Sequence, residues 1–180
     1  MNKGVDHIGV CVVYFCHDGN GEFVMAKRNS NSRDEHGCWD IGGGAIELGD
    51  TVEDTILREI REEYCTDVLN FEFLGYRDVH RIHDGKATHW IALDFKVQIN
   101  RDKVKIGEPH KFDEIAWFDL ENLPTKTHSQ FPKFLELHYD KLKYAPVAQL
   151  DRASACGAGG HRFESRRAHQ FSDLARQEDI

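Results

Sequence analysis

The chain has 180 residues, 40% of them hydrophobic and 30% charged, which is typical of one globular domain or one domain with a tail. Acidic side chains outnumber basic ones by 31 to 23, and the resulting net charge of −8 argues against a broad surface for a nucleic acid polymer. No apolar run approaches the roughly 20 residues of a membrane span, and the first residues lack a leader-like stretch, so we expect a cytoplasmic protein without a membrane partner.

The five cysteines include no CxxC pair, which argues against a zinc ribbon or a thioredoxin-type site. Reduced thiols in a cytosolic protein are the simpler interpretation. Among the 11 histidines, His80, His83 and His89 are spaced for strands and loops rather than for a metal-binding pair on a helix. We therefore do not expect a structural zinc site.

Apolar patterning is continuous up to about residue 145, and the elements expected there alternate between strands and helices. Strands on both sides of a central helix, followed by a C-terminal helix, predict a mixed α/β domain in which helices pack on a sheet. The expected strands are 8–15, 22–27, 71–79, 88–99 and 115–118, the expected helices are 51–64 and 129–143, and residues 17–21 and 29–37 are expected to form a turn and a loop.

The segment 39–66 carries most of the chemistry. Three consecutive glycines at positions 42–44 precede a helix, and glycines allow the backbone to approach a ligand or metal closely. Thr51 and Asp54 have the spacing of a capping box at the start of that helix. The expected buried face of the helix carries Val52, Ile56, Ile60 and Tyr64, with Leu57 beside them.

Glu59, Glu62 and Glu63 share a second face of this helix, because they are three and four residues apart. Like charges at these spacings repel by a few tenths of a kcal/mol per pair, and Arg58 partly offsets this repulsion. Three carboxylates beside a glycine-rich turn offer hard oxygen ligands to Mg²⁺ or Mn²⁺. The alternative is a solvated acidic helix face.

The order and spacing of these residues resemble the box of the Nudix hydrolase family, G-x5-E-x7-R-E-U-x-E-E-x-G-U, in which U is aliphatic. The segments 39–43 and 108–124 are also similar to the family, so the resemblance covers about residues 5–143. It implies an α/β fold, a Nudix-type α/β/α sandwich with a mixed β-sheet, as a domain at residues 1–145. The chain matches the box at Gly44, Arg58, Glu59, Ile60, Glu62 and Glu63.

Three departures from the family pattern stand out. Asp50 replaces the first glutamate of the box, Cys65 and Thr66 replace its closing glycine and aliphatic residue, and Gly42 stands where a proline often occurs. We expect the helix exit to differ. None of the departures removes a carboxylate from the core of the box.

The resemblance implies hydrolysis of a nucleoside diphosphate linked to another group, with a divalent cation on the phosphates and a carboxylate that takes a proton from water. Glu59 is the first candidate for the base and Glu108 the alternative. By position, the expected metal ligands are the Gly43 carbonyl, Glu59, Glu62 and Glu63, the expected orienting group is Arg58, and Gly44 and Asp50 support the box.

The substrate is less sharply indicated. His80 stands where members that cleave ADP-ribose often carry a proline, and the arrays of NADH-cleaving and coenzyme A-cleaving members are absent. These absences favour a (d)NTP or modified (d)NTP; ADP-ribose, a dinucleotide, or binding by a non-catalytic nucleotide sensor are the alternatives. His80, Arg81 and Trp90 are candidate substrate-binding residues. The oligomeric state stays open, with a homodimer as one alternative.

Residues 146–180 follow no consistent helical or strand period. The stretch 147–153 resembles the conceptual translation of the D-arm of a transfer RNA gene, and 162–165 that of its T-loop. Residues 168–170 are similar to a translated CCA end, which favours a bacterial genome. We expect a disordered or weakly ordered read-through tail, with a selected peptide tail as the alternative.

Overall fold

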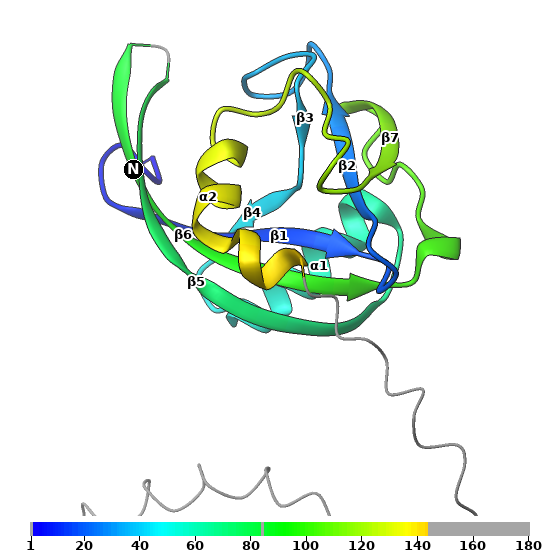
Figure 1. Cartoon of the computed structure of the whole chain (residues 1–180). Helices are drawn as coiled ribbons and strands as arrows, with labels where there is room; N and C mark the ends of the chain where they lie inside the picture. The colour runs from blue at the N-terminus through cyan, green and yellow to red at the C-terminus, as the bar shows by residue number, and fades with distance from the viewer. Residues whose placement is uncertain (1, 84, 144–180) are drawn as a thin grey trace, which may run out of the picture. The chain divides into compact units, whose positions relative to one another are not determined.

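The computed structural model describes residues 2–83 and 85–143, so the predicted tail lies outside the described residues. Within them, a seven-stranded sheet is accompanied by two α-helices (Figure 1). The elements are β1 (Gly9–His17), β2 (Phe23–Arg28), β3 (Trp39–Asp40), β4 (Gly43–Ala45), α1 (Val52–Tyr64), β5 (Val68–His83), β6 (Lys86–Ile99), the 3₁₀ helix η1 (Arg101–Lys103), β7 (Phe112–Phe118) and α2 (Phe131–Lys143).

The sheet is mixed, as the sequence predicts. Its main path runs β3-β2-β1-β6-β5, with β4 paired to β1 and β7 paired to β2. β1 and β6 are parallel from the pair Gly9–Trp90 to the pair His17–Gln98, and the remaining pairs are antiparallel. The long β5–β6 hairpin projects beyond the rest of the sheet (Figure 1).

Two apolar cores lie on opposite faces of β1, because successive side chains of a strand alternate between faces. Val12 and Tyr14 belong to the core that α1 covers, whereas Phe15 belongs to the core that α2 covers. This arrangement confirms the predicted α/β/α sandwich. The fully buried apolar side chains that the helices contribute are Ile56, Ile60 and Tyr64 from α1 and Phe134 from α2.

The helix predicted at 51–64 is present as α1. Thr51 caps it, and the reciprocal bonds of the capping box are both formed: the Thr51 hydroxyl accepts from the Asp54 N–H, and the Asp54 carboxylate accepts from the Thr51 N–H. The prediction that Leu57 flanks the buried face was wrong, since Leu57 is 37% exposed and Thr55 is buried instead. Leu57 and Thr55 both adjoin Ile56 of the apolar stripe, but only Thr55 is on the buried side.

Strands β5 and β6 extend beyond the predicted ranges 71–79 and 88–99, and the second helix begins two residues later than predicted. The sequence reading missed β3 and β4. With two and three residues, these strands are too short to show a strand period. No described helix is long and apolar enough to cross a membrane.

A buried ion-pair network fastens α2 to the sheet. Asp94 is fully buried, and its two oxygens lie 2.8 and 3.1 Å from Arg77 Nε. His138 of α2 places its Nε2 2.9 Å from the same carboxylate, and Arg77 also donates to the Gln130 side chain. The carboxylate of Asp94 is therefore compensated from β5 and from α2 at once.

The exit of α1 places a residue other than glycine in the left-handed conformation. Cys65 caps the helix in the left-handed conformation, with φ 53° and ψ 29°, where glycine avoids the steric cost of a side chain. We expect Cys65→Gly to raise the free energy of unfolding by about 1 kcal/mol, or about 3–4 °C in thermal midpoint.

Cys65→Ala is the matched control for this prediction, measured by thermal unfolding beside the parent. It removes the exposed thiol but keeps a Cβ at the strained position, so it should give no such gain. Equal stabilisation by alanine and glycine would show that the thiol, and not the backbone conformation, is the source of the effect.

Candidate active site

The glycine run forms a turn and a short strand against β1, in register Val13–Gly43 and Val12–Gly44. A Cβ on Gly44 would lie 2.1 Å from Glu59 Cδ. Gly42 has φ +99°, and a Cβ there would lie 2.8 Å from Glu63 Oε2. The absence of side chains at Gly42 and Gly44 therefore lets two carboxylates of α1 lie directly against this backbone.

Arg58 links the acidic residues of the box. Its guanidinium lies 2.6 Å from Glu59, 3.6 Å from Glu62 and 3.5 Å from Asp50. Burial raises the pKa of Glu59, and the ion pair with Arg58 opposes that shift. Arg58 thus reduces the repulsion among these three carboxylates.

Glu63 is the most deeply buried carboxylate of the box, 6% exposed. The Tyr14 hydroxyl donates a 2.5 Å hydrogen bond to its Oε2. Burial raises the pKa of Glu63 from 4.5 to about 8, and the nearby charges of Glu59, Asp40 and Glu108 act in the same direction. Such a carboxylate is costly to ionise alone and suits a partner cation.

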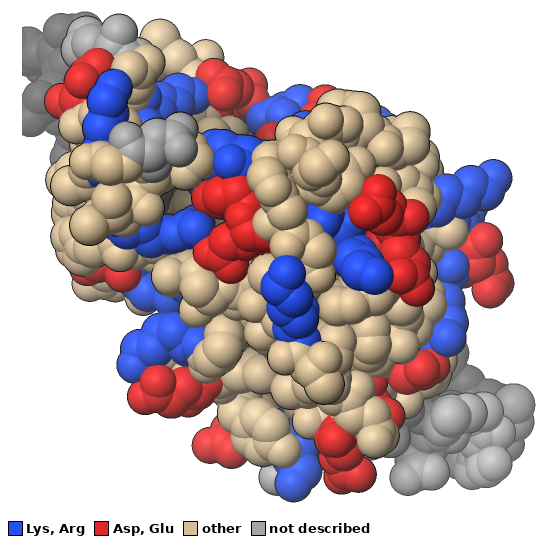
Figure 2. All heavy atoms as spheres, turned by 90° about the horizontal axis from the view of Figure 1, so that it is seen from above, with Lys and Arg blue, Asp and Glu red and all other residues tan. Residues whose placement is uncertain are grey.

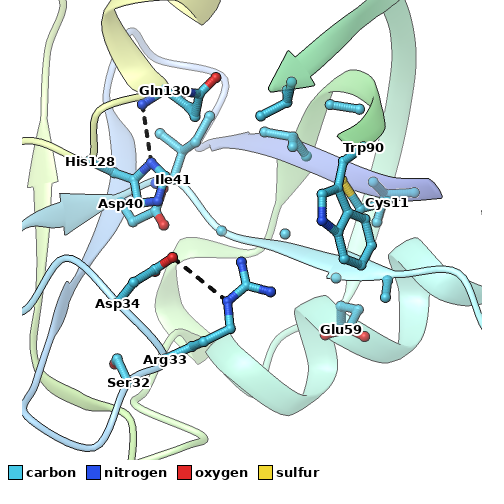
Figure 3. A pocket seen from close by; sticks show the side chains of 18 of the residues that line it. Cys11, Ser32, Arg33, Asp34, Asp40, Ile41, Glu59, Trp90, His128 and Gln130 are labelled. Carbon is cyan, nitrogen blue, oxygen red and sulfur yellow. Dashed lines mark hydrogen bonds and ion pairs between the residues drawn. The ribbon is translucent and has the colours of Figure 1, made fainter. Parts of the chain in front are cut away.

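A cavity of about 640 Å³ opens above these groups. Glu59 lies at its floor, with Trp90 and Cys11 on one side and Arg33 and Asp34 on the other (Figure 3). The volume is in the range of small-molecule sites, about 300–1,000 Å³. The basic side chains that line the cavity are Lys3, Arg28, Arg33, Arg77, Arg81 and Lys111.

Acidic side chains line the cavity as well, namely Asp34, Asp40, Glu47, Glu59 and Glu63. On the face that Figure 2 presents, acidic and basic side chains of the described residues are likewise interspersed, and neither sign covers a broad area. That face therefore does not offer the extended basic surface that a polyanion needs.

The structure brings together some of the predicted site residues and separates others. Arg81 and Trp90 line the cavity, whereas His80 lies on the opposite face of β5, because neighbouring residues of a strand alternate. Glu62 is half exposed beside Arg58 and does not line the cavity. Glu108 lies outside the lining, paired at 2.7 Å with Lys111, which does line it.

Trp90 is held in place by two glycines of the N-terminal segment. A Cβ on Gly4 would lie 2.1 Å from the indole nitrogen, and one on Gly9 would lie 2.5 Å from the ring. The indole therefore rests flat against backbone and forms one fixed wall of the cavity.

The opposite wall of the cavity comes from the loop 29–37, for which the sequence predicts an irregular segment but no part in the site. Arg28 pairs with Asp34 at 2.9 Å, and Arg81 pairs with Asp34 at 3.1 Å and with Glu35 at 2.6 Å. The Ser129 N–H and hydroxyl both donate to Glu35, which ties the loop to the segment before α2. One basic and two acidic residues in succession at 33–35 were the signal that could have indicated this network.

The donor set fits a hard divalent cation. Oxygen atoms of the Gly43 backbone, Glu59 and Glu63 border the same floor of the cavity, and oxygen ligands are those that Mg²⁺ prefers. The α1 glutamates are oriented by different partners, since Arg58 holds Glu59 and Tyr14 holds Glu63.

Comparison with known proteins agrees with this geometry. A family model described as the NUDIX domain matches residues 6–138. The chain belongs to the NUDIX domain family. The resemblance stated from the box is thereby confirmed, and the match includes all of α1 and the part of α2 up to His138.

The curated relatives of this NUDIX domain carry different names. An ADP-ribose pyrophosphatase of Methanocaldococcus jannaschii is 33% identical over 106 residues, 58% of this chain and 59% of that protein. A nucleoside triphosphatase NudI of an Enterobacter species is 33% identical over 114 residues, 59% of this chain and 79% of that protein. The chain thus spans about three fifths of the archaeal relative's length. Both names describe hydrolysis of phosphoric anhydrides.

Solved structures support the fold. The MutT NUDIX hydrolase from Burkholderia pseudomallei superposes with a TM-score of 0.64 at 24% identity, covering 73% of this chain and 98% of that one. A MutT protein from Methanosarcina mazei gives the same TM-score at 23% identity, covering 76% and 96%. The NUDIX sandwich therefore accounts for the described body of the chain.

Proposed function

We propose that this chain is a metal-dependent pyrophosphohydrolase that cleaves a (d)NTP or modified (d)NTP to the monophosphate, acting in the cytoplasm with Mg²⁺ or Mn²⁺. One observation carries the proposal: Glu59 and Glu63 lie against the glycine turn in the lining of the cavity, and Arg58 is paired with Glu59. A bound divalent cation would neutralise charge on the phosphate oxygens. The residues of the chain supply the remaining functions.

Each group of the box receives a role in this proposal. The Gly43 carbonyl, Glu59 and Glu63 hold the cation, and Glu62, which lies outside the cavity lining, supports the site through its ion pair with Arg58. Arg58 positions Glu59, because it binds Oε1 and leaves the second carboxylate oxygen free of that ion pair. Glu59 remains the first candidate for the base that takes the proton from water, and Glu108 is the alternative.

The walls of the cavity support a nucleotide as substrate. The Trp90 indole offers a flat apolar surface on which a base can stack, with a gain of about 1–3 kcal/mol in comparable single-base contacts. Guanidinium groups of Arg33 and Arg81 border the other side, and guanidinium pairs well with phosphate. ADP-ribose is the second candidate, supported by the name of the archaeal relative.

A substrate panel tests the proposal. Purified protein with Mg²⁺ is supplied with NTPs, dNTPs, oxidised dNTPs, ADP-ribose and dinucleotides, and the products are separated by chromatography. We expect monophosphate and pyrophosphate from a (d)NTP. Products from ADP-ribose alone would favour the second candidate, and nucleotide binding without any turnover would favour a sensor.

Substitutions at Asp50 test whether the box needs the glutamate that the family pattern carries at this position. Its carboxylate lies 3.5 Å from Arg58, and both side chains are about one third exposed, so the pair contributes at most about 1 kcal/mol. Asp50→Glu restores the missing methylene, and we expect kcat/KM to stay within about twofold of the parent or to rise slightly.

Asp50→Asn is the matched control, because it keeps the length of aspartate and removes the charge. It should lower kcat/KM by no more than about fivefold, the equivalent of about 1 kcal/mol. Complete loss of activity in Asp50→Glu would show that Asp50 touches the substrate or the metal directly.

A further inference from the structure

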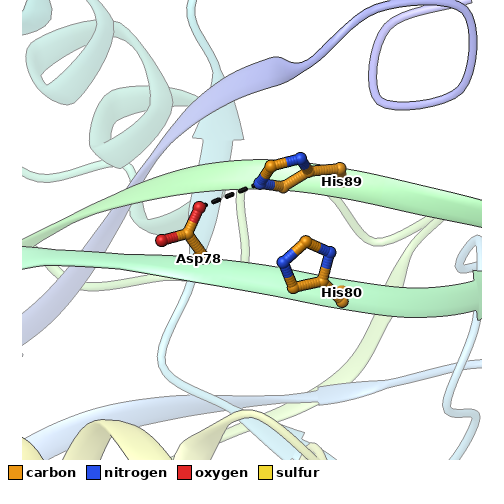
Figure 4. A group of neighbouring side chains, drawn as sticks. All are labelled: Asp78, His80 and His89. Atoms are coloured by element: carbon orange, nitrogen blue, oxygen red, sulfur yellow. Dashed lines mark hydrogen bonds and ion pairs between the residues drawn. The ribbon is translucent and has the colours of Figure 1, made fainter.

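Three metal-ligating side chains meet on the outer face of the β5–β6 hairpin, away from the cavity. His80 and His89 are directly paired across the two strands, with ring centroids 4.2 Å apart (Figure 4). The His89 N–H donates to the Gly4 carbonyl and not to β5, so the two histidines form a non-hydrogen-bonded pair. Side chains approach most closely in pairs of that type.

Asp78 completes the group from the same face of β5, two residues before His80. Its Oδ1 lies 2.9 Å from His89 Nε2. One ligand atom from each of the three side chains lies within 4.8 Å of the other two. Asp78 and His80 are exposed and His89 is half-exposed, so small rotations need not disturb the core.

The surroundings of the group do not compete for its carboxylate. The neighbouring positions on this face of the two strands are Tyr76, Ile82, Ala87 and Ile91, none of them cationic. The basic residues Arg77 and Arg81 alternate onto the cavity face. At these described positions, no basic side chain competes with a cation from solution for the two imidazoles and the carboxylate.

We propose that Asp78, His80 and His89 form a binding site for Zn²⁺ or a chemically similar late first-row divalent ion. Two imidazole nitrogens and one carboxylate oxygen are a donor set typical of zinc, with water in the remaining position. Ligands of tetrahedral zinc lie about 3.4 Å apart, given bond lengths of about 2.0–2.1 Å. The three ligand atoms can reach that spacing by side-chain rotation.

This site differs in chemistry and place from the carboxylate floor of the cavity. Mg²⁺ prefers oxygen ligands, whereas imidazole selects zinc, nickel and copper. We did not expect zinc from the sequence, because the histidines do not have the spacing of a metal-binding pair on a helix. The register of β5 and β6 instead brings His80 and His89 together across two strands. A metal here would join β5 to β6, which carry Arg81 and Trp90 on their cavity face.

Titration calorimetry with ZnCl₂ in excess MgCl₂ tests the proposal on the full chain. We expect one Zn²⁺ per chain and at least tenfold weaker binding in each of His80→Gln and His89→Gln. His7→Gln is the matched control, an exposed histidine outside the group, and should bind zinc like the parent.

Thermal unfolding with and without zinc distinguishes the loss of a zinc ligand from misfolding of a variant. Without zinc, the two variants should unfold at the parent's midpoint, and added zinc should raise the midpoint of the parent and of His7→Gln only. Equal zinc affinity in His80→Gln, displacement of zinc by Mg²⁺, or loss of binding in Cys65→Ser would overturn the proposal. Hydrolysis of any nucleotide plays no part in these measurements.

Discussion

Glu63→Gln should lower kcat/KM at least about 100-fold. Glutamine keeps the size of the side chain and can still accept the Tyr14 hydrogen bond, so only the charge is removed. Losing one ligand charge that stabilises the transition state by about 3 kcal/mol corresponds to this factor. The measurement is steady-state hydrolysis of the best substrate of the panel at saturating Mg²⁺.

Glu53→Gln provides the control on the same helix. Glu53 is exposed in the first turn of α1 and outside the cavity, so its loss should leave kcat/KM unchanged. If Glu63→Gln retained full activity at saturating Mg²⁺, Glu63 would not be a ligand of the catalytic cation.

The contribution of Glu63 to the free energy of unfolding of the metal-free protein should fall as pH rises from about 4.5 to about 8. Glu63 has a pKa near 8 in the folded chain because it is buried, against 4.5 when unfolded. Its protonated form is therefore favoured by folding, and stability is greatest below the unfolded pKa and is lost as pH rises through the folded one. The loss attributable to this group is on the order of 5 kcal/mol.

Denaturant unfolding in a chelator at several pH values, compared between the parent and Glu63→Gln, isolates this contribution. The other titrating groups are common to both proteins, so the difference between the two curves reports on Glu63. At pH 8 the variant should be the more stable protein without metal, and Mg²⁺ should stabilise the parent more than the variant. Parallel curves at all pH values would contradict the prediction.

The parts of the fold that the sequence predicted well are those with a long periodic pattern or a complete local signal. α1 has both, because Thr51 and Asp54 cap it and its apolar residues recur every four positions. β3 and β4 have neither, and their place depends on pairing with β2 and β1. Leu57 was wrongly assigned to the buried face, because helical periodicity indicates which way the apolar stripe faces but not how many neighbouring residues are buried with it.

The candidate site likewise has parts that the sequence predicts and parts that it does not. The residues of the box lie close together in sequence, so the spacing of the family pattern identifies Arg58, Glu59 and Glu63. The wall formed by Arg33 and Asp34 depends on ion pairs with distant strands, which no local pattern encodes. Of the neighbours His80 and Arg81, alternation requires that only one face the cavity, and the packing of β5 decides which.

The shared carboxylate of Asp94 joins the cavity wall to the second helix. Separating α2 from the sheet would take His138 away from Asp94 and leave the carboxylate with Arg77 as its charged partner. In native-state hydrogen exchange, the amides of α2 and of β5 around Arg77 should therefore open together, as one cooperative unit. Transient fraying of α2 would then loosen the wall of the cavity that Arg77 lines.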